Sequence, residues 1–164
     1  MKKLSLFLGC VLAATSSLGF AADKLKLAVD VPYEPFEYKA PDGTLTGFEI
    51  DLGNAVCAEI KAECEWVIQA WDGIIPGLLA RKYDAIFSSM SITPERAEKV
   101  LFSDGYYNTP SAWFGKKGMD LDVTNKDALK GKRVGVQRGT LQDDYVTNQV
   151  GADVVDIKRY TTAD

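Results

Sequence analysis

The chain has 164 residues, of which 46% are apolar and 26% charged, the composition of an ordinary globular protein. Its 19 basic and 23 acidic residues nearly balance and form no basic cluster, which disfavours nucleic acid as a partner. Histidine, the commonest general base and metal ligand, is absent from the sequence, which disfavours an enzyme without excluding one. We expect no metal site and no cofactor.

The N-terminal segment is typical of an export signal. Two lysines provide a positive start, residues 4–18 form an apolar stretch too short to span a bilayer, and residues 19–21 offer small residues for signal peptidase. We predict cleavage after Ala21, which leaves an exported, acidic protein. A lipoprotein signal around Cys10 is the alternative, but that cysteine comes too early, inside the apolar stretch.

Two cysteines, Cys57 and Cys64, remain after the predicted cleavage. An even pair in an oxidising compartment predicts a disulfide, and a bridge across so short a loop stabilises a fold by roughly 2–3 kcal/mol. Two buried free thiols are the alternative. A metal site would require further cysteine or histidine ligands, which the mature sequence lacks.

Strands and helices alternate along the first part of the mature chain. Prolines and glycine between residues 32 and 43 indicate a loop after the first strand. Hydrophobic periodicity distinguishes the expected strands from the expected helices. The strands are expected at residues 24–29, 66–68 and 85–87, the helices at residues 49–62 and 73–81, and a third, short helix at Pro94.

A second strand–helix unit follows an extended pattern at residues 111–115 and a polar, charged stretch at residues 116–130. It comprises an expected strand at residues 133–136, a helix at 140–149 and a strand at 154–157. Such alternation favours an α/β sheet over a sandwich, and we predict two lobes, residues 22–110 and 111–164. The second lobe has only about 50 residues, near the lower limit for an independent core, so we expect a fragment or a truncated reading frame.

Residues 88–96, of sequence Ser-Ser-Met-Ser-Ile-Thr-Pro-Glu-Arg, follow a predicted strand and lead into a helix. Thr93 suits the N-cap position, and the free N–H groups of a helix start attract an anion. Arg96 can add a bidentate guanidinium for a carboxylate, while the Ser89 carbonyl and the Ser91 hydroxyl suit an ammonium group. Together these groups predict a site for an α-amino acid. A capped helix with an exposed arginine is the alternative.

A second helix start has the same chemistry. Thr140 and Asp143 have the spacing of a capping box, and the N–H groups of Thr140 and Leu141 could meet the same carboxylate from the other lobe. An ordinary capping box is the alternative. Two such helix starts on two lobes suggest a cleft that closes on its ligand.

Three further residues could contact a ligand side chain. Asp30 and Tyr33 lie near the end of the first predicted strand, the edge at which open α/β sheets bind ligands. Asp30 could pair with a cationic side chain, and Tyr33 or Trp71 could pack along its methylenes. An ordinary loop carboxylate and ordinary packing are the alternatives.

Five collinear stretches span nearly all of the mature chain. They are Tyr-Glu-Pro-Phe-Glu at 33–37, Gly-Phe-Glu-Ile-Asp-Leu at 47–52, Tyr-Asp-Ala-Ile at 83–86, residues 88–96, and Leu-Lys-Gly-Lys-Arg-Val-Gly-Val at 129–136. With them the chain resembles the polar amino-acid-binding proteins of bacterial ABC importers (solute-binding protein family 3), in the lysine/arginine/ornithine and histidine branch. The resemblance implies a periplasmic binding protein-like fold with two lobes and a hinge. A monomer of this fold closes around a polar, here basic, amino acid and docks on a membrane permease.

The resemblance also implies roles for the residues above. Arg96 would hold the ligand carboxylate, helped by backbone N–H groups of Ser91 and of Thr140 or Leu141. Ser89 and Ser91 would take its α-ammonium group. The ligand side chain would meet the remaining set: Ser88, Tyr33, Trp71 and, for a distal positive charge, Asp30. Cys57 and Cys64 match the disulfide positions of this branch.

The chain departs from the family pattern in two places. Leu141 stands where relatives often carry a second threonine, so only its backbone can serve. The family's chain continues well past Asp164, into a part that supplies an acidic residue for the α-ammonium group. We therefore expect weak binding or none by the chain as it stands.

Two other functions use the same scaffold. A periplasmic dehydratase would need a general acid in the cleft, and no candidate stands out, while the serines have no histidine to activate them. The ectodomain of an amino-acid sensor would need a transmembrane segment beyond Asp164. Nucleotide-binding and hydrolase motifs are absent from the sequence.

Overall fold

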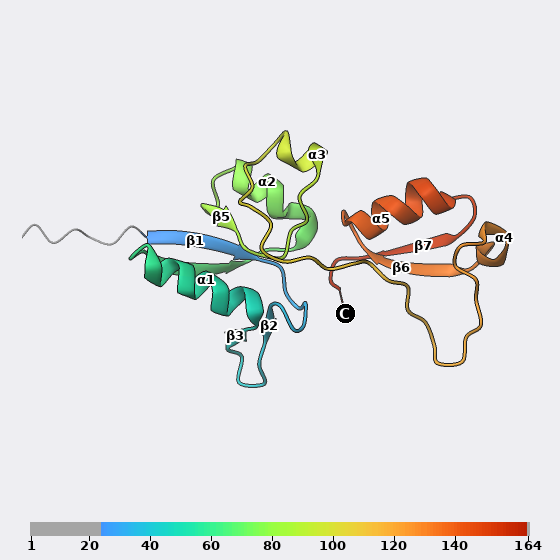
Figure 1. Cartoon of the computed structure of the whole chain (residues 1–164), viewed down its shortest axis with the longest axis horizontal. Coiled ribbons are helices and arrows are strands. Elements are labelled where there is room, and N and C mark those ends of the chain that lie inside the picture. The colour runs from blue at the N-terminus through green and yellow to red at the C-terminus, as the bar shows by residue number, and fades with distance from the viewer. Residues whose placement is uncertain (1–23, 164) are drawn as a thin grey trace, which may run out of the picture.

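The computed structural model describes residues 24–163, so the predicted signal peptide lies outside the described residues. Two α/β lobes follow one another along the long axis of the molecule (Figure 1). Residues 101–115, which contain neither helix nor strand, connect the two lobes. In this part of the chain no helix is both long enough and apolar enough to cross a membrane.

A parallel three-stranded sheet forms the centre of the first lobe. Its order is β4 (Glu63–Ile68), β1 (Lys24–Val29), β5 (Ala85–Ile86), so β1 lies between two neighbours. The central position explains why the last three residues of β1 are buried. β4 begins three residues earlier than the hydrophobic pattern predicts, because its register with the six residues of β1 starts at the pair Lys24 and Glu63.

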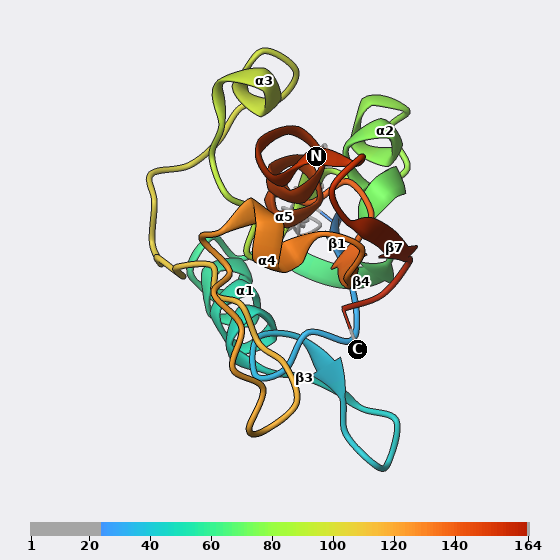
Figure 2. The same cartoon turned by 90° about the vertical axis from the view of Figure 1, so that its right-hand side faces the viewer.

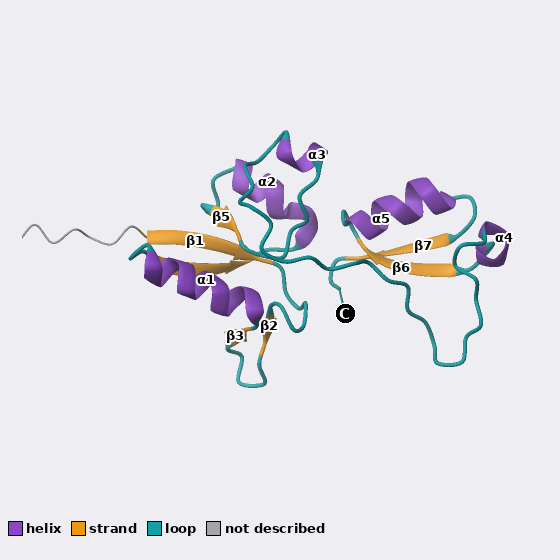
Figure 3. Ribbon diagram, in the orientation of Figure 1, coloured by secondary structure: helices purple, strands orange, loops and turns teal. Residues whose placement is uncertain are grey.

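Helices cover both faces of this sheet. α1 (Phe48–Glu59) lies on one face and α2 (Ile74–Leu79) on the other (Figures 1 and 3). Both are shorter than predicted, since α1 ends at Glu59 and a 3₁₀ turn, η1 (Trp71–Gly73), precedes α2. Ile74 of α2 packs with Ala28 and Tyr83 in the core, and the Tyr83 hydroxyl donates to the Ile74 carbonyl.

A short hairpin was not predicted from the sequence. It consists of β2 (Tyr38–Lys39) and β3 (Leu45–Thr46), which pair antiparallel around a turn at residues 41–43, within the region expected as a loop. With two residues in each strand, it offers too little alternation to be recognised as a strand pattern. Gly47 connects the hairpin to α1 with φ at 124°, and a Cβ there would collide with the Phe36 carbonyl, so glycine is required.

The predicted disulfide between Cys57 and Cys64 is confirmed. It connects the last turn of α1 to β4. Cys57 is buried at 6% exposure, so the bridge extends the packing between the helix and the sheet edge.

The second lobe pairs two parallel strands and covers them with a helix. In chain order it contains α4 (Lys126–Leu129), β6 (Arg133–Gln137), α5 (Leu141–Tyr145), the π-helical η2 (Val146–Gly151) and β7 (Asp156–Tyr160). Leu129, Val146, Val150 and Val155 form its core.

Two expectations about this part of the chain were wrong in detail, and one short helix was missed. The strand expected at 154–157 starts at Asp156, because Val155 is buried in the core and follows a turn at 152–154. α4 was not predicted, because its four residues lie within a polar stretch. Residues 111–115 form no strand; the connection swings out to one side of the two lobes before it reaches α4 (Figure 2).

Candidate functional site

The segment at residues 88–96 forms the predicted helix start. Thr93 is the N-cap of α3 (Pro94–Ala97), and its hydroxyl accepts a hydrogen bond of 3.2 Å from the Arg96 N–H. Ser89 lies in the left-handed region with φ at 47°, which turns the chain sharply between β5 and α3.

Arg96 and Trp71 meet at one groove. The Arg96 guanidinium lies 5.4 Å from the centre of the Trp71 ring, and its Nη1 donates to the Ser91 carbonyl at 3.0 Å. Burial lowers the pKa of Arg96, while nearby acidic Asp144 and Glu95 oppose that change. Among residues 24–163, no carboxylate lies within 4.0 Å of this guanidinium. The half-buried cation is therefore available to an anionic ligand group.

The groove encloses about 540 Å³ and has walls from both lobes. Its apolar floor and the ring of Trp71 come from the first lobe, while Gly139, Leu141 and Asp144 come from the second. The first-lobe lining also includes Thr93, Glu95, Arg96 and Lys99. Apolar surface beside a cation and several carboxylates suits a small, amphipathic, zwitterionic ligand.

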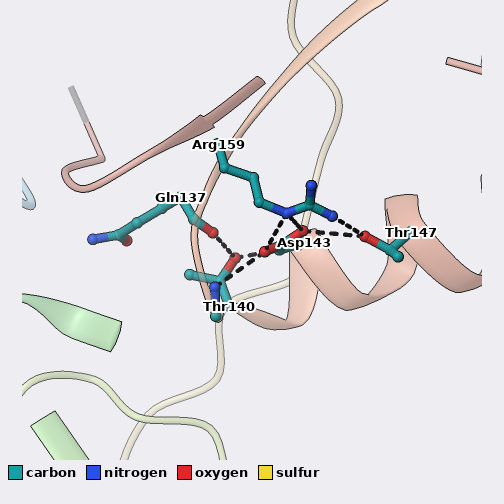
Figure 4. Close-up of polar contacts among 6 residues, drawn as sticks. Gln137, Thr140, Asp143, Thr147 and Arg159 are labelled. Atoms are coloured by element: carbon teal, nitrogen blue, oxygen red, sulfur yellow. Dashed lines mark hydrogen bonds and ion pairs between the residues drawn. The ribbon is translucent and has the colours of Figure 1, made fainter. Parts of the chain in front are cut away.

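The second predicted helix start is also present. Thr140 is the N-cap of α5, and its hydroxyl accepts from the Asp143 N–H at 3.2 Å and donates to the Gln137 carbonyl at 2.8 Å (Figure 4). In a capping box the side chain of the fourth residue also accepts a hydrogen bond from the N–H of the N-cap residue, and here that second bond is shifted by one residue. The Asp143 carboxylate accepts from the Gly139 N–H at 3.1 Å instead of from Thr140.

An ion pair between Arg159 and Asp143 holds the first turn of α5 against β7. Arg159 of β7 donates from Nε to the Asp143 carboxylate at 2.8 Å, and from Nη2 to the Thr147 hydroxyl at 2.7 Å (Figure 4). Asp143 is only 7% exposed, whereas the Arg159 side chain is 36% exposed, so the ion pair is partly buried. The helix start that faces the groove is thus supported by β7.

Three polar contacts join the lobes directly within residues 24–163. The Trp71 indole N–H donates to the Gly139 carbonyl at 3.0 Å, and Arg138 pairs with Asp72 at 3.6 Å. The Gln137 amide donates to the Asp30 carboxylate at 2.6 Å. Gln137 was not singled out in the sequence, although its place at the end of β6, just before the capping box, was a usable signal.

Asp30 and Ser88 belong to a buried hydrogen-bond network. The Asp30 N–H donates to the Ser88 hydroxyl at 3.0 Å, and that hydroxyl donates to the Glu37 carboxylate at 2.6 Å. Burial raises the pKa of Asp30, and the bond from Gln137 lowers it. Burial also raises the pKa of Glu37, to about 8, with a further rise from Glu49 and Asp30.

Ser89 is held by a second buried carboxylate. Its N–H and its hydroxyl donate to Glu49 Oε1 at 3.0 Å and 2.5 Å. The Tyr106 hydroxyl donates to the same carboxylate at 2.9 Å. Neither Glu37 nor Glu49 was predicted as a site residue, because the local sequence around each does not reveal that its carboxylate is buried.

The structure does not bring all the predicted residues to one surface. Trp71, Arg96 and Leu141 line the groove, whereas Tyr33 lines a separate hollow with Pro32, Glu34 and Ala163. Tyr33 stacks on Phe36 at 5.3 Å and is 39% exposed. The hydroxyls of Ser88 and Thr140 make bonds within the protein.

Comparison with curated proteins identifies close relatives. The L-arginine-binding protein of Pseudomonas aeruginosa is 45% identical over 163 residues, which are 99% of this chain and 62% of the relative. The lysine/arginine/ornithine-binding periplasmic protein of Escherichia coli is 39% identical and covers 98% and 61% of the two chains. The chain thus spans about three fifths of the length of the curated relatives that it matches.

Solved structures show the same fold. An ancestral arginine-binding protein bound to arginine superposes with a TM-score of 0.76 at 33% identity, covering 85% of this chain and 61% of that one. An ancestral amino acid-binding protein described as a precursor of cyclohexadienyl dehydratase superposes with a TM-score of 0.73 at 34% identity, again covering 85% and 61%. The predicted periplasmic binding protein-like fold is confirmed, with only part of the two-lobed fold present in this chain.

Residues 25–154 match the family described as bacterial extracellular solute-binding proteins, family 3. This match covers most of the described residues and agrees with the relatives and the solved structures. The resemblance noted in the sequence is thereby confirmed, and the chain belongs to family 3 of the bacterial extracellular solute-binding proteins.

Proposed function

We propose that the protein captures a polar, basic amino acid in the periplasm and, as a monomer, delivers it to the membrane permease of an ABC importer. Arginine, lysine, ornithine and histidine are the candidate ligands. One observation carries the proposal: the half-buried Arg96 guanidinium lies against Trp71 in a groove between the lobes and has no carboxylate partner among the described residues. Relatives named for arginine, lysine and ornithine support the choice of ligand class.

In this proposal Arg96 holds the ligand carboxylate. The backbone N–H groups of Ser91 and of Thr140 or Leu141 assist it from the two sides of the groove. A guanidinium binds a carboxylate with two parallel hydrogen bonds, which fix the orientation of the ligand as well as its charge. Burial lowers the pKa of Arg96 because it disfavours the charged guanidinium, and a ligand carboxylate beside the guanidinium would stabilise that charged form.

Ser89 and Ser91 accept the α-ammonium group, through a carbonyl and a hydroxyl. Ser88, Tyr33 and Trp71 border the ligand side chain, and Asp30 receives a distal positive charge. Asp30 is 5% exposed and already accepts from Gln137, so a cationic side chain has to share or replace that bond. The Tyr33 ring has to leave the hollow that it lines with Pro32, Glu34 and Ala163 to join Trp71.

The proposal describes a binding protein and not an enzyme. Its named relatives are binding proteins, whereas one structural neighbour is a precursor of a dehydratase, which keeps a dehydratase as the second candidate. Incubation with a hydroxylated cyclohexadienyl substrate separates the two, because arginine, lysine, ornithine and histidine have no alcohol group that could leave as water. Quantitative recovery of the unchanged substrate supports a receptor, and its conversion to a product that has lost water contradicts it.

Binding is best measured on two proteins. The first is the chain itself without residues 1–21. The second, the extended chain, carries after residue 163 the part of the L-arginine-binding relative that follows the matched region, because this chain spans 62% of that relative. A cooperative thermal transition of the extended chain is the control for its folding.

A thermal-shift screen with the twenty amino acids and ornithine tests the proposal. We expect arginine, lysine, ornithine or histidine to raise the melting temperature of the extended chain most, and to shift the shorter chain little. Asp30→Asn is expected to weaken arginine and lysine much more than glutamine. Equal losses for all three ligands would refute the role of Asp30, and no shift by any amino acid would refute the function.

A further inference from the structure

Glu49 is a charged side chain in the interior of the first lobe. It is the second residue of α1 and has no exposed surface. A buried carboxylate is costly unless donors surround it, and Glu49 receives three: the Ser89 N–H, the Ser89 hydroxyl and the Tyr106 hydroxyl. Its position in the first turn of a helix also favours a negative charge.

The three donors come from two segments that serve different purposes. Ser89 lies in the sharp turn at residues 88–96 and has a φ of 47°. This backbone conformation is unfavourable for a serine, so it depends on the contacts that hold the residue, and the direction of the Ser89 carbonyl changes if those contacts weaken. Tyr106 lies in the connection between the lobes, at residues 101–115. Glu49 is the one described side chain that bonds to both.

We infer that Glu49 is a positioning residue that couples the ammonium-accepting turn to the connection between the lobes. This inference rests on the proposed function, since the ammonium group is that of the proposed ligand. By holding both Ser89 donors, the carboxylate leaves the Ser89 carbonyl free and aimed for a ligand. By holding Tyr106, it ties the same turn to the segment that connects the two lobes.

Neighbouring tyrosines provide a matched pair of variants. The Tyr106 hydroxyl bonds to Glu49, whereas Tyr107 contributes its ring to contacts with Phe36 and Phe48, and no hydrogen bond of its hydroxyl is found among residues 24–163. Both tyrosines are about half exposed, so Tyr106→Phe and Tyr107→Phe are equally mild changes. Glu49→Gln removes the charge and keeps the shape.

The first experiment uses the chain without added ligand. Hydrogen exchange of the Ser89 amide, followed by nuclear magnetic resonance, is expected to accelerate about tenfold in Glu49→Gln and about threefold in Tyr106→Phe, because weaker or looser acceptors protect it less. Tyr107→Phe is expected to leave the rate unchanged. Unchanged exchange in both of the first two variants, or an equal effect of Tyr107→Phe, overturns the inference.

The second experiment uses the extended chain and two ligands, arginine and the analogue that carries hydrogen in place of the α-ammonium group. Glu49→Gln is expected to weaken the binding of arginine about tenfold and the binding of the analogue less than twofold. Tyr106→Phe is also expected to weaken the binding of arginine more than that of the analogue. Equal losses for both ligands indicate a merely structural role and overturn the inference. Failure of the unmodified extended chain to bind arginine, lysine, ornithine or histidine contradicts the proposed function instead, and the exchange experiment then still tests the link from Glu49 to the turn. If Glu49→Gln does not fold, Tyr106→Phe decides both experiments.

Discussion

Gln137, the last residue of β6, donates a hydrogen bond of 2.6 Å to the Asp30 carboxylate across the two lobes. The two residues are 107 positions apart in the chain. Asp30 follows the central strand of the first lobe and is buried, so without the amide its charged form would lose a partner in a poorly solvated place. Before a ligand arrives, the second lobe therefore covers the carboxylate that we propose for a cationic side chain.

Replacing Gln137 by alanine is expected to raise the pKa of Asp30 further. Burial already raises this pKa, and the Gln137 hydrogen bond, which favours the charged form, is the largest opposing effect. A carbon-detected titration of the ligand-free chain measures it. Gln142→Ala is the control, because that amide bonds to Ser111 on the surface. An Asp30 pKa that is the same in both variants would show that the contact across the lobes is not formed in solution.

The stability of the chain is expected to fall between pH 4.5 and about 8 because of Glu37. In the folded state burial raises the pKa of Glu37 from 4.5 to about 8, so over this range the unfolded chain releases a proton that the folded chain keeps. The stabilisation is complete below pH 4.5 and is lost as the pH rises to about 8. The fall is at most about 5 kcal/mol, since one pKa unit corresponds to about 1.4 kcal/mol.

Glu37→Gln is expected to flatten this part of the profile, because the amide resembles the protonated acid and still accepts from Ser88. Urea unfolding at pH 5, 6.5 and 8 measures the effect. Glu34→Gln, at an exposed position of the same loop, should retain the fall. The buried groups that face Glu37, namely Asp30, Glu49 and Ser88, stay unchanged in both variants. Parallel profiles for the wild type and Glu37→Gln would rule out a raised pKa.

Removing the disulfide is expected to cost about 2–3 kcal/mol of stability. Cys57 and Cys64 are seven positions apart, and closing a loop of this size restricts the unfolded chain by roughly that free energy. The double serine variant, unfolded in urea without reductant, gives the value. The wild type with dithiothreitol should match it, and a wild type indifferent to the reductant would mean that the bridge contributes nothing.

The ion pair behind the second helix start is expected to matter more than an exposed one nearby. Asp143→Asn should cost about 1–3 kcal/mol, since Asp143 is 7% exposed and loses a charged partner in Arg159. Lys158→Ala should cost less than about 1 kcal/mol, because its pair with Asp156 is half exposed. Equal costs in urea unfolding would show that the partly buried ion pair of Asp143 and Arg159 gives no added support to Thr140.

The fold was largely predictable where long periodic segments carry it. β1 was predicted with its observed bounds, because its six residues form one continuous segment. Polar and apolar residues alternate in its first half, and its last three residues are apolar and buried. The hairpin and α4 were missed because elements of two to four residues leave no periodicity to detect. The early start of β4 depends on its register with β1, which is a tertiary property that no window of the sequence contains.

The sequence predicted which residues form the helix starts of the site better than it predicted the hydrogen bonds between distant residues. Thr93 and Thr140 were expected as N-caps and are N-caps, because capping depends on neighbours in the sequence. The Gln137 contact with Asp30 depends on how two lobes meet, and the roles of Glu37 and Glu49 depend on burial. Neither lobe contact nor burial of an acidic residue follows from local spacing.

Calorimetric titration of the extended chain with arginine tests the central claim most directly, in the wild type, in Arg96→Gln and in Arg81→Gln. Arg81 is an exposed arginine after α2 and serves as the matched control for loss of one positive charge. We predict that the wild type and Arg81→Gln bind arginine alike, and that Arg96→Gln binds it at least about 30-fold more weakly, because loss of one partner from a buried charge pair costs about 2 kcal/mol or more. Arginine binding that is the same in all three proteins would contradict the account.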